Sequence, residues 1–166
     1  ALPVVMGMSS PLIFGIWGPG GRLRPGAYYF PLPYGTVPVV PDAAIVPMNG
    51  FDEQGYRLGY GSGYFDRTLA ATQPRLLALG VSFEFARLPT IYPQPHDIPM
   101  DFVVTEAGVH AMSNARLESI TPEECRARAQ RLCAERGLPR QRAGAVGGYS
   151  SPPCYAGEFP GYFGDA

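Results

Sequence analysis

The stretch "RLGYGSGYFDR", residues 57–67, carries the residue types best suited to chemistry in this sequence. Three glycines at alternate positions run directly into a segment with helical character. A glycine-rich loop that opens a helix offers several backbone N–H groups to one anion, and the helix N-terminus adds partial positive charge. Phosphate is the ligand that this pattern favours, and Arg57 and Arg67 can add charge-assisted hydrogen bonds to it.

Asp66, in the first turn of the expected helix, would repel a bound phosphate unless a hard cation such as Mg²⁺ lay between them. A purely structural interpretation is also open, because the helix dipole favours aspartate in any first turn and Tyr60, Tyr64 and Phe65 can belong to the core. The spacing does not fit a dinucleotide fingerprint, and the chain has no lysine for a Walker loop. The residues alone therefore leave phosphate binding and helix capping as alternatives.

A second group of polar residues lies in "PHDIPMDFVVTEAGV", with His96, Asp97, Asp101 and Glu106 before and after an apolar run. Ligands of parallel sheets gather at the carboxyl ends of strands, whereas Asp97 precedes the expected strand. From composition, a turn aspartate between two prolines is the favoured interpretation. His96 is likewise expected to be a turn or packing residue.

The composition excludes several classes of protein. The chain has 166 residues, a net charge of -1 and 16% charged residues, which argues against a nucleic-acid partner or an anionic membrane surface. All thirteen basic residues are arginine, so a Schiff-base lysine is excluded within this sequence. The cysteines Cys125, Cys133 and Cys154 lack zinc-site spacing, and no apolar run approaches the ~20 residues of a membrane span. We expect a monomeric cytoplasmic protein whose N-terminal portion is missing.

The apolar runs predict an α/β fold with a largely parallel sheet. They lack the alternation of a half-exposed strand, so we expect them to be buried on both faces; they cover residues 2–6, 11–17, 43–48, 76–83 and 101–106. A helix is predicted from about residue 63 to a point before Pro74. Residues 18–42 are rich in Gly and Pro and are predicted to be an extended loop.

A second helix is predicted at about 121–136. Thr121 is a good N-cap, Pro122 suits the first helical position, Glu124 completes a capping box and Gly137 ends the helix. A soft boundary near Ser113 divides the chain into a domain of residues 1–113 and an extension of residues 114–166. The Gly, Pro and aromatic tail from residue 139 is expected to be mostly loop that docks on the domain; an interaction element around Cys154 and Glu158 is the alternative.

The run "VPMNGFDEQGYRLGYGSGYFDRTLA", followed by "ALGVSFEF" and "PHDIPMDFVVTEAGV", resembles 5-formyltetrahydrofolate cyclo-ligase, also called 5,10-methenyltetrahydrofolate synthetase. The resemblance covers about residues 2–110. It implies a three-layer α/β sandwich and an enzyme that converts 5-formyltetrahydrofolate to 5,10-methenyltetrahydrofolate, using ATP and Mg²⁺ and releasing ADP and phosphate.

The resemblance also implies roles for individual residues. Arg57 and Asp66 would be catalytic, and Asp66 and Asp97 would bind Mg²⁺. Trp17, Phe14 and Tyr64 are candidates for contacts with the folate rings. The ATP phosphates would be held by Arg57, Leu58, Gly59, Tyr60, Gly61, Ser62, Gly63, Tyr64 and Phe65.

Three departures from the family leave other functions open. The family's segment with the phosphate-binding lysine is expected to be missing before Ala1, Ser62 and Phe65 replace the common glycine and tyrosine, and Leu32 stands where an acidic residue is expected. The main alternative is a non-catalytic homologue that binds a nucleotide or folate. A related fold that handles phosphosugars or coenzyme A is a third possibility.

Overall fold

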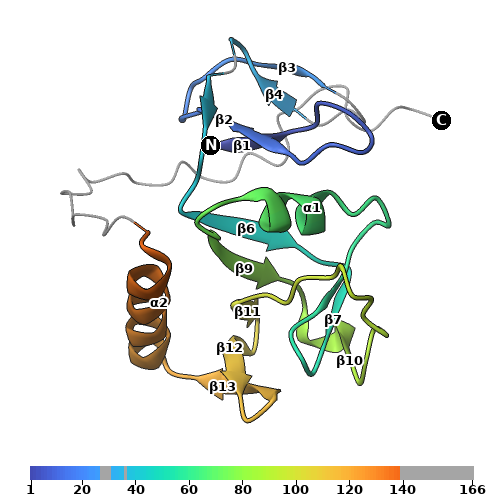
Figure 1. Cartoon of the computed structure of the whole chain (residues 1–166), viewed down its shortest axis with the longest axis vertical. Helices are drawn as coiled ribbons and strands as arrows, with labels where there is room; N and C mark the ends of the chain where they lie inside the picture. The colour runs from blue at the N-terminus through green and yellow to red at the C-terminus, as the bar shows by residue number, and fades with distance from the viewer. Residues whose placement is uncertain (27–30, 36, 139–166) are drawn as a thin grey trace.

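The computed structural model describes residues 1–26, 31–35 and 37–138. Short strands before residue 40 lie on one side of the first helix, and a larger sheet lies on its other side (Figure 1). The strands of the first part are β1 (Leu2–Val4), β2 (Ile13–Gly15), β3 (Leu23–Pro25), β4 (Pro31–Pro33) and β5 (Pro38–Val39). Those that follow are β6 (Ala43–Pro47), β7 (Gly50–Asp52), β8 (Arg57–Leu58), β9 (Leu77–Val81), β10 (Arg87–Leu88), β11 (Phe102–Thr105), β12 (Gly108–Ser113) and β13 (Arg116–Ile120). The helices are α1 (Tyr64–Ala71), α2 (Pro122–Arg136) and the short 3₁₀ helix η2 (Glu84–Ala86).

The central sheet has five strands in the order β13-β12-β11-β9-β6. β6, β9 and β11 run parallel, with Ile45 opposite Leu79 and Leu79 opposite Phe102. β12 and β13 complete the sheet in the antiparallel direction. α1 lies in the crossover between β6 and β9, which is how parallel neighbours are usually joined. The predicted α/β fold with a largely parallel sheet is confirmed.

One face of this sheet forms the core. Val46 of β6, Val103 of β11 and Leu69 of α1 are buried together in it. β6 alternates between exposed and buried positions, and Ile45 on its other face is 73% exposed. The prediction that this run is buried on both faces is therefore wrong, because α1 covers only one side of β6.

The first two apolar runs also differ from prediction. β1 and β2 pair antiparallel with each other, and β2 pairs antiparallel with β5, so they form a small sheet separate from the parallel strands. β3, β4 and β5 fall within the Gly- and Pro-rich residues predicted to be loop. The N–H of Leu12 donates to Oγ1 of Thr68 at 2.9 Å, which ties this part of the chain to α1.

At the C-terminal end of the described chain, α2 begins and ends where the capping residues in the sequence predict. Oγ1 of Thr121 accepts from the N–H of Glu124, the Glu124 side chain accepts from the N–H of Thr121, and Gly137 has a left-handed φ of 68°. The predicted capping box and helix are therefore confirmed. β13 pairs with β12, so the central sheet continues past Ser113 into the predicted extension.

The predicted tail from residue 139, with Cys154 and Glu158, lies outside the described residues. Among the described residues, neither α1 nor α2 has the length and apolarity of a membrane-spanning helix.

Candidate functional site

The glycine-rich loop joins β8 to α1, and its backbone conformation depends on glycine. Gly61 has φ 85° and Gly63 has φ 63°, both in the left-handed region that other residues seldom adopt. A Cβ atom at Gly61 would meet nothing within 4 Å, so the loop backbone faces open space. Gly63 is the N-cap of α1 and provides no side-chain cap. The N–H groups of a first helical turn have no intrahelical partners, so this end of α1 suits an anion.

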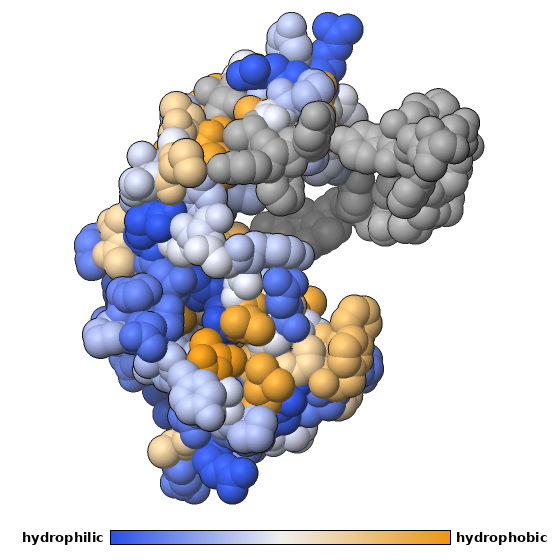
Figure 2. Space-filling view, turned by 90° about the vertical axis from the view of Figure 1, so that its right-hand side faces the viewer, coloured by the Kyte–Doolittle hydropathy of each residue, from blue (hydrophilic) through white to orange (hydrophobic). Residues whose placement is uncertain are grey.

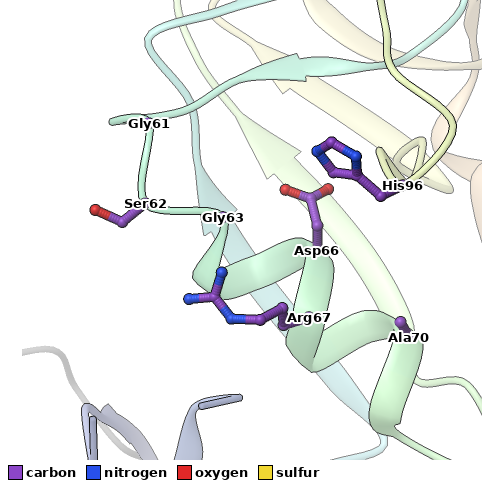
Figure 3. A pocket seen from close by; sticks show the side chains of 7 residues that line it. All are labelled: Gly61, Ser62, Gly63, Asp66, Arg67, Ala70 and His96. Atoms are coloured by element: carbon purple, nitrogen blue, oxygen red, sulfur yellow. The ribbon is translucent and has the colours of Figure 1, made fainter. Parts of the chain in front are cut away.

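A pocket of about 340 Å³ lies at the junction of the loop and the helix. In Figure 3, the loop from Gly61 to Gly63 leads into the first turn of α1, and the side chain of His96 approaches Asp66 from a separate segment. The residues that line the pocket come from the loop, one side of α1 and the segment before β11: Gly61, Ser62, Gly63, Asp66, Arg67, Ala70 and His96. The volume is within the usual range for small-molecule sites.

Arg67 gives this pocket a cationic wall. Its guanidinium lies 5.0 Å from the ring centroid of Tyr64, and its Nη2 donates to the carbonyl of Met8 at 3.1 Å. Its Nε is buried and has no hydrogen-bond partner among the described residues. A guanidinium at the pocket can donate charge-assisted hydrogen bonds to an anion. The Arg67 side chain therefore fits a phosphate bound at the loop.

Asp66 is held from two sides. Its Oδ2 accepts from Nη2 of Arg57 at 2.6 Å, and its Oδ1 accepts from the backbone N–H of Ile98 at 3.1 Å. The Asp66 side chain is 14% exposed and that of Arg57 is 5% exposed. Arg57 also donates to the carbonyl of Ile98 at 3.4 Å and does not line the pocket. The geometry makes Arg57 the residue that orients Asp66.

The hairpin that precedes the loop fixes the position of Arg57. Asp52 is fully buried, and its Oδ1 accepts from the backbone N–H groups of Gln54 and Tyr56 at 3.0 and 2.9 Å. Its Oδ2 accepts from the N–H of Ile91 at 3.2 Å. Because these bonds fix the turn between β7 and β8, they also fix the strand from which the Arg57 side chain reaches Asp66.

Asp97 lies in a turn next to the pocket. Its Oδ2 accepts from the N–H of Gln94 at 2.7 Å, and its Oδ1 is 3.8 Å from Nε2 of His96. His96, which the sequence predicts to be a turn or packing residue, lines the pocket, whereas Asp97 does not. The described residues contain no group of three or more His, Cys, Asp or Glu side chains arranged for a metal. Mg²⁺ needs only one or two carboxylates when phosphates and water complete its shell, so Asp66 fits a cation that arrives with a nucleotide.

The three aromatic candidates for folate contacts differ in position. Phe14 is buried in the hydrophobic core. Trp17 is half-buried, and its indole N–H donates to the carbonyl of Gly21 at 3.0 Å. Tyr64 lies beside the pocket under the guanidinium of Arg67. Phe14 therefore offers little of its ring to a ligand, while the other two keep some exposure.

A second polar group lies at the carboxyl ends of β9 and β11. Oε1 of Glu84 accepts from Nε of Arg87 at 2.6 Å, and its Oε2 accepts from Oγ1 of Thr105 at 2.9 Å. Burial opposes ionisation of Glu84, but these bonds and the charges of Arg87 and His110 outweigh it and lower the pKa of the carboxyl. Burial, followed by the charge of Arg87, lowers the pKa of His110. His110 is therefore neutral near pH 7, with Nδ1 facing the Nη2 donor of Arg87 at 3.2 Å.

Comparison with known proteins finds similarity in the region that holds the pocket. Residues 37–106 match the model of the 5-formyltetrahydrofolate cyclo-ligase family, and this range contains the glycine loop, Asp66 and Asp97. A 5-formyltetrahydrofolate cyclo-ligase of Mycolicibacterium smegmatis is 33% identical over 103 residues, which is 55% of this chain and 53% of that protein. The enzyme of Escherichia coli K12 is 37% identical over 73 residues, 41% of this chain and 38% of that protein.

A solved structure agrees with these matches. The 5,10-methenyltetrahydrofolate synthetase of Aquifex aeolicus is similar with a TM-score of 0.54 and 32% identity, covering 72% of this chain and 61% of that protein. The resemblance predicted from the sequence is thereby confirmed. The chain spans about half or less of the length of the curated relatives that it matches.

Proposed function

Starting from the family match over residues 37–106, we propose that this chain carries the nucleotide-binding part of an ATP-dependent 5-formyltetrahydrofolate cyclo-ligase. The observation that carries the proposal is the convergence of three features in one pocket. These are an open glycine loop, the N-terminus of α1 and the guanidinium of Arg67. Each favours a phosphate group, and all lie within or next to the matched range.

The proposed reaction converts 5-formyltetrahydrofolate and ATP to 5,10-methenyltetrahydrofolate, ADP and phosphate. The formyl oxygen on N5 attacks the γ-phosphorus, and the bond from that phosphorus to ADP breaks. N10 then attacks the formyl carbon and loses its proton, and the oxygen departs with the phosphate. Phosphorylation is needed because a formamide oxygen is a poor leaving group. The task of the protein is to align the donor and acceptor and to offset the phosphate charge.

The stretch from Arg57 to Phe65 would hold the triphosphate. Backbone N–H groups around Gly61 and Gly63 would bind phosphate oxygens, and Arg67 would donate from the base of the loop. Arg57 would act through Asp66, since its guanidinium is committed to that carboxylate. The aromatic rings of Trp17 and Tyr64 remain the candidates for contact with the folate.

Asp66, with Asp97 as a second candidate, would hold Mg²⁺ together with the nucleotide. The ion, when bound, would supply positive charge between the phosphate oxygens. Asp66 already lines the pocket with a fixed orientation, whereas Asp97 would have to turn from the N–H of Gln94. We therefore give Asp66 the main role. The monomeric state and the cytoplasmic location stay predictions.

A second candidate function is binding of a nucleotide or folate without turnover. The absence of lysine from these 166 residues favours it, because arginine is the only cationic side chain that this part of the protein can offer to the γ-phosphate beside a bound Mg²⁺. The two candidates make the same prediction for ATP binding and differ only in product formation.

An absorbance assay for methenyltetrahydrofolate distinguishes them. The full-length protein that contains this chain is incubated with 5-formyltetrahydrofolate, ATP and Mg²⁺, and we expect product whose appearance requires all three. Nucleotide binding without product supports the non-catalytic homologue. A chain that binds neither ATP nor 5-formyltetrahydrofolate contradicts both candidates.

A further inference from the structure

A second pocket, of about 490 Å³, is lined by residues of α2, β11 and β12 and of the segments that lead into these strands. We call it the α2 pocket. Among the described residues, none lines both this pocket and the one at the glycine loop. α2 stands at the left of Figure 1, and Figure 2 shows the opposite side of the molecule, where apolar side chains gather on the lower half. The α2 pocket is therefore separate from both the glycine loop and this apolar surface.

α2 turns charged side chains toward the pocket. Arg128, Arg131, Leu132 and Glu135 line it, and their spacing of three and four residues places them on one face of the helix. A helix that packs on a sheet usually presents an apolar stripe to that sheet. This face of α2 instead carries two guanidinium groups and a carboxylate beside a single leucine, which packing alone does not explain.

The sheet side of the pocket is apolar. Met100, Phe102 and Ala111 line it and are at most 2% exposed, and Met112 lines it beside them. An apolar floor with a few charged groups at its edge is typical of sites for organic molecules. A bare inorganic ion would fill only a small part of this volume and would gain nothing from the floor.

Positive charge predominates around the floor. The charged residues of the lining are three arginines and two acidic residues: Arg75, Arg128, Arg131, Asp101 and Glu135. Asp101 is paired with a further arginine outside the lining, because its two oxygens accept from Arg136 at 2.5 and 2.9 Å. The lining therefore presents more positive than negative charge to a ligand.

Two of the three arginines are held in place by backbone carbonyls. Nη2 of Arg75 donates to the carbonyl of Pro99 at 2.8 Å, and Nη1 of Arg128 donates to the carbonyl of Met112 at 2.6 Å. A guanidinium has five N–H donors in one plane, so each of these side chains keeps donors for a ligand. Carboxylate and phosphate groups accept such donors in pairs.

We propose that the α2 pocket binds an organic oxyanion, a small carboxylate or phosphate ester. Its charged group binds Arg128 and Arg131, and its apolar body covers the floor at Met100 and Phe102. The parts of β12 and α2 that line the pocket lie beyond residue 106, outside the range that matches the family model. The inference is therefore independent of the proposed function and adds a second binding site to the chain.

Calorimetric titration of the whole chain with phenyl phosphate and with phenylacetate tests the proposal. We expect at least one of the two to bind, and its affinity to fall at least about tenfold in Arg128→Gln and in Arg131→Gln, because each variant loses a charge-assisted hydrogen bond. Benzylamine and benzyl alcohol carry the ring with a positive charge or with none, so both should bind far more weakly. Arg126→Gln, at an exposed position of α2 outside the lining, should leave the affinity unchanged.

Two controls assign the binding to this pocket. Arg131 is exposed, so Arg131→Gln should fold, and urea denaturation checks that its stability matches the wild type. Phenyl phosphate is also a possible ligand of the glycine loop, and Arg67→Gln is the matched variant for that pocket. We expect Arg67→Gln to keep the binding that the α2 variants lose.

Three results would overturn the proposal. They are the absence of binding for both oxyanions, an equal affinity for benzyl alcohol, and binding that Arg67→Gln abolishes while Arg128→Gln and Arg131→Gln leave it unchanged. None of these results alters the proposed function, because ATP binding at the glycine loop involves no residue of the α2 pocket. A failure of ATP binding would likewise leave the α2 pocket proposal standing.

Discussion

Two neighbours fix the orientation of the Asp66 side chain, which lines the pocket. Arg57 and the N–H of Ile98 each bind one of its oxygens, so the carboxylate keeps one orientation as it lines the pocket. Each oxygen still has a lone pair available for a metal ion. If the loop binds phosphate as proposed, a cation held by Asp66 would lie between the carboxylate and the phosphate and would offset their repulsion.

Asp66→Asn should remove the dependence of ATP affinity on Mg²⁺. The amide is similar in size but lacks the charge that binds a hard cation. ATP affinity measured with Mg²⁺ and with EDTA should differ in the wild type and should be nearly equal in the variant. Glu118→Gln, which removes one charge from an exposed position, should behave as wild type.

Measuring ATP affinity both with Mg²⁺ and with EDTA distinguishes the loss of a metal ligand from a distortion of the site. Loss of the Asp66 charge leaves Arg57 with a weaker partner, and any resulting distortion should reduce the affinity with and without Mg²⁺ by similar factors. A variant that keeps the full Mg²⁺ effect would contradict the role of Asp66.

Among the residues of the site, those in the loop could be predicted from the sequence, whereas the distant residues that contact them could not. Asp66 and Arg67 could be assigned because they lie next to the glycines. Arg67 and Met8 are in contact but lie 59 residues apart in the sequence, so no local sequence pattern predicts the contact. The pocket wall formed by His96 was missed for the same reason, because only the tertiary path of the segment before β11 brings it to Asp66.

The glycine loop and α1 act as one element, and the loop conformation is the part that a substitution can test. Gly61→Ala places a side chain in a left-handed conformation, at a cost of about 1–2 kcal/mol, and puts a Cβ where the phosphate should bind. We expect ATP affinity to fall at least about tenfold, as measured by calorimetric titration.

Gly20→Ala is the matched control for this change. Gly20 has φ 79° and, like Gly61, has nothing within 4 Å of the added Cβ, so the backbone cost should be similar. Both variants should lose comparable stability, but Gly20→Ala should bind ATP normally. Equal ATP affinities in the two variants would show that the loop does not bind the nucleotide.

The end of α2 is attached to the sheet by Arg136. Its Nη1 donates to Oδ2 of Asp101 at 2.9 Å and to the carbonyl of Leu76 at 3.0 Å. The hydrogen bond to Asp101 raises the pKa of Arg136. Burial lowers this pKa, but the negative charge of Asp101 raises it further, so the pair stays ionised. Arg136→Gln should lower the free energy of unfolding by about 1–3 kcal/mol, because it removes the closer of the two arginines that pair with the buried carboxylate of Asp101 and leaves only Arg75, at 3.4 Å.

Urea denaturation of Arg136→Gln and of Arg126→Gln checks this prediction. Arg126 lies on the same helix but is exposed, so its replacement should change the free energy of unfolding by less than about 0.5 kcal/mol. Equal effects of the two substitutions would mean that the contact with Asp101 does not stabilise the fold.

Elements with local signals were predicted well, and those that depend on distant pairing were not. The capping box of Thr121 and Glu124 lies within four residues, so the sequence determines where α2 begins. By contrast, the run that becomes β2 is apolar in the same way as a central parallel strand. Its antiparallel partners β1 and β5 are set by chain topology, which apolar periodicity does not encode.

For the molecule as a whole, the buried histidine predicts a dependence of stability on pH. The folded-state pKa of His110 lies below its ordinary value of 6.5, because of burial and the charge of Arg87, partly offset by Glu84 and Glu53. The unfolded chain therefore binds a proton first as the pH falls. The free energy of unfolding should decrease as the pH drops below about 6.5. Once the pH is below the folded-state pKa of His110, this residue should cause no further decrease.

The pKa of Glu84 is lowered as well, so protonation of the unfolded chain below about pH 4.5 should cause a further loss of stability. Denaturation curves at a series of pH values can separate the two contributions. His110→Gln should remove the decline that starts near pH 6.5 and keep the one at lower pH. An unchanged first decline in this variant would contradict the assignment to His110.

The exposed side of β6 could not be predicted from the sequence. Ile45 has the side chain of a buried strand residue, yet α1 covers only the opposite face of the sheet. An apolar residue type shows that a side chain can be buried. Whether it is buried depends on which helices and strands pack against it. The same reasoning applies to Phe83, the last residue of an apolar run predicted to be buried, whose side chain is 63% exposed.

The central claim is that the pocket between the glycine loop and α1 binds ATP together with Mg²⁺. Calorimetric titration of the whole chain with ATP, in the presence of Mg²⁺ and again in EDTA, tests it most directly. We predict a single site that is clearly tighter with Mg²⁺ and that is weakened by Gly61→Ala but not by Gly20→Ala. Absence of ATP binding in the wild type, or binding that neither Mg²⁺ nor Gly61→Ala alters, would contradict the claim.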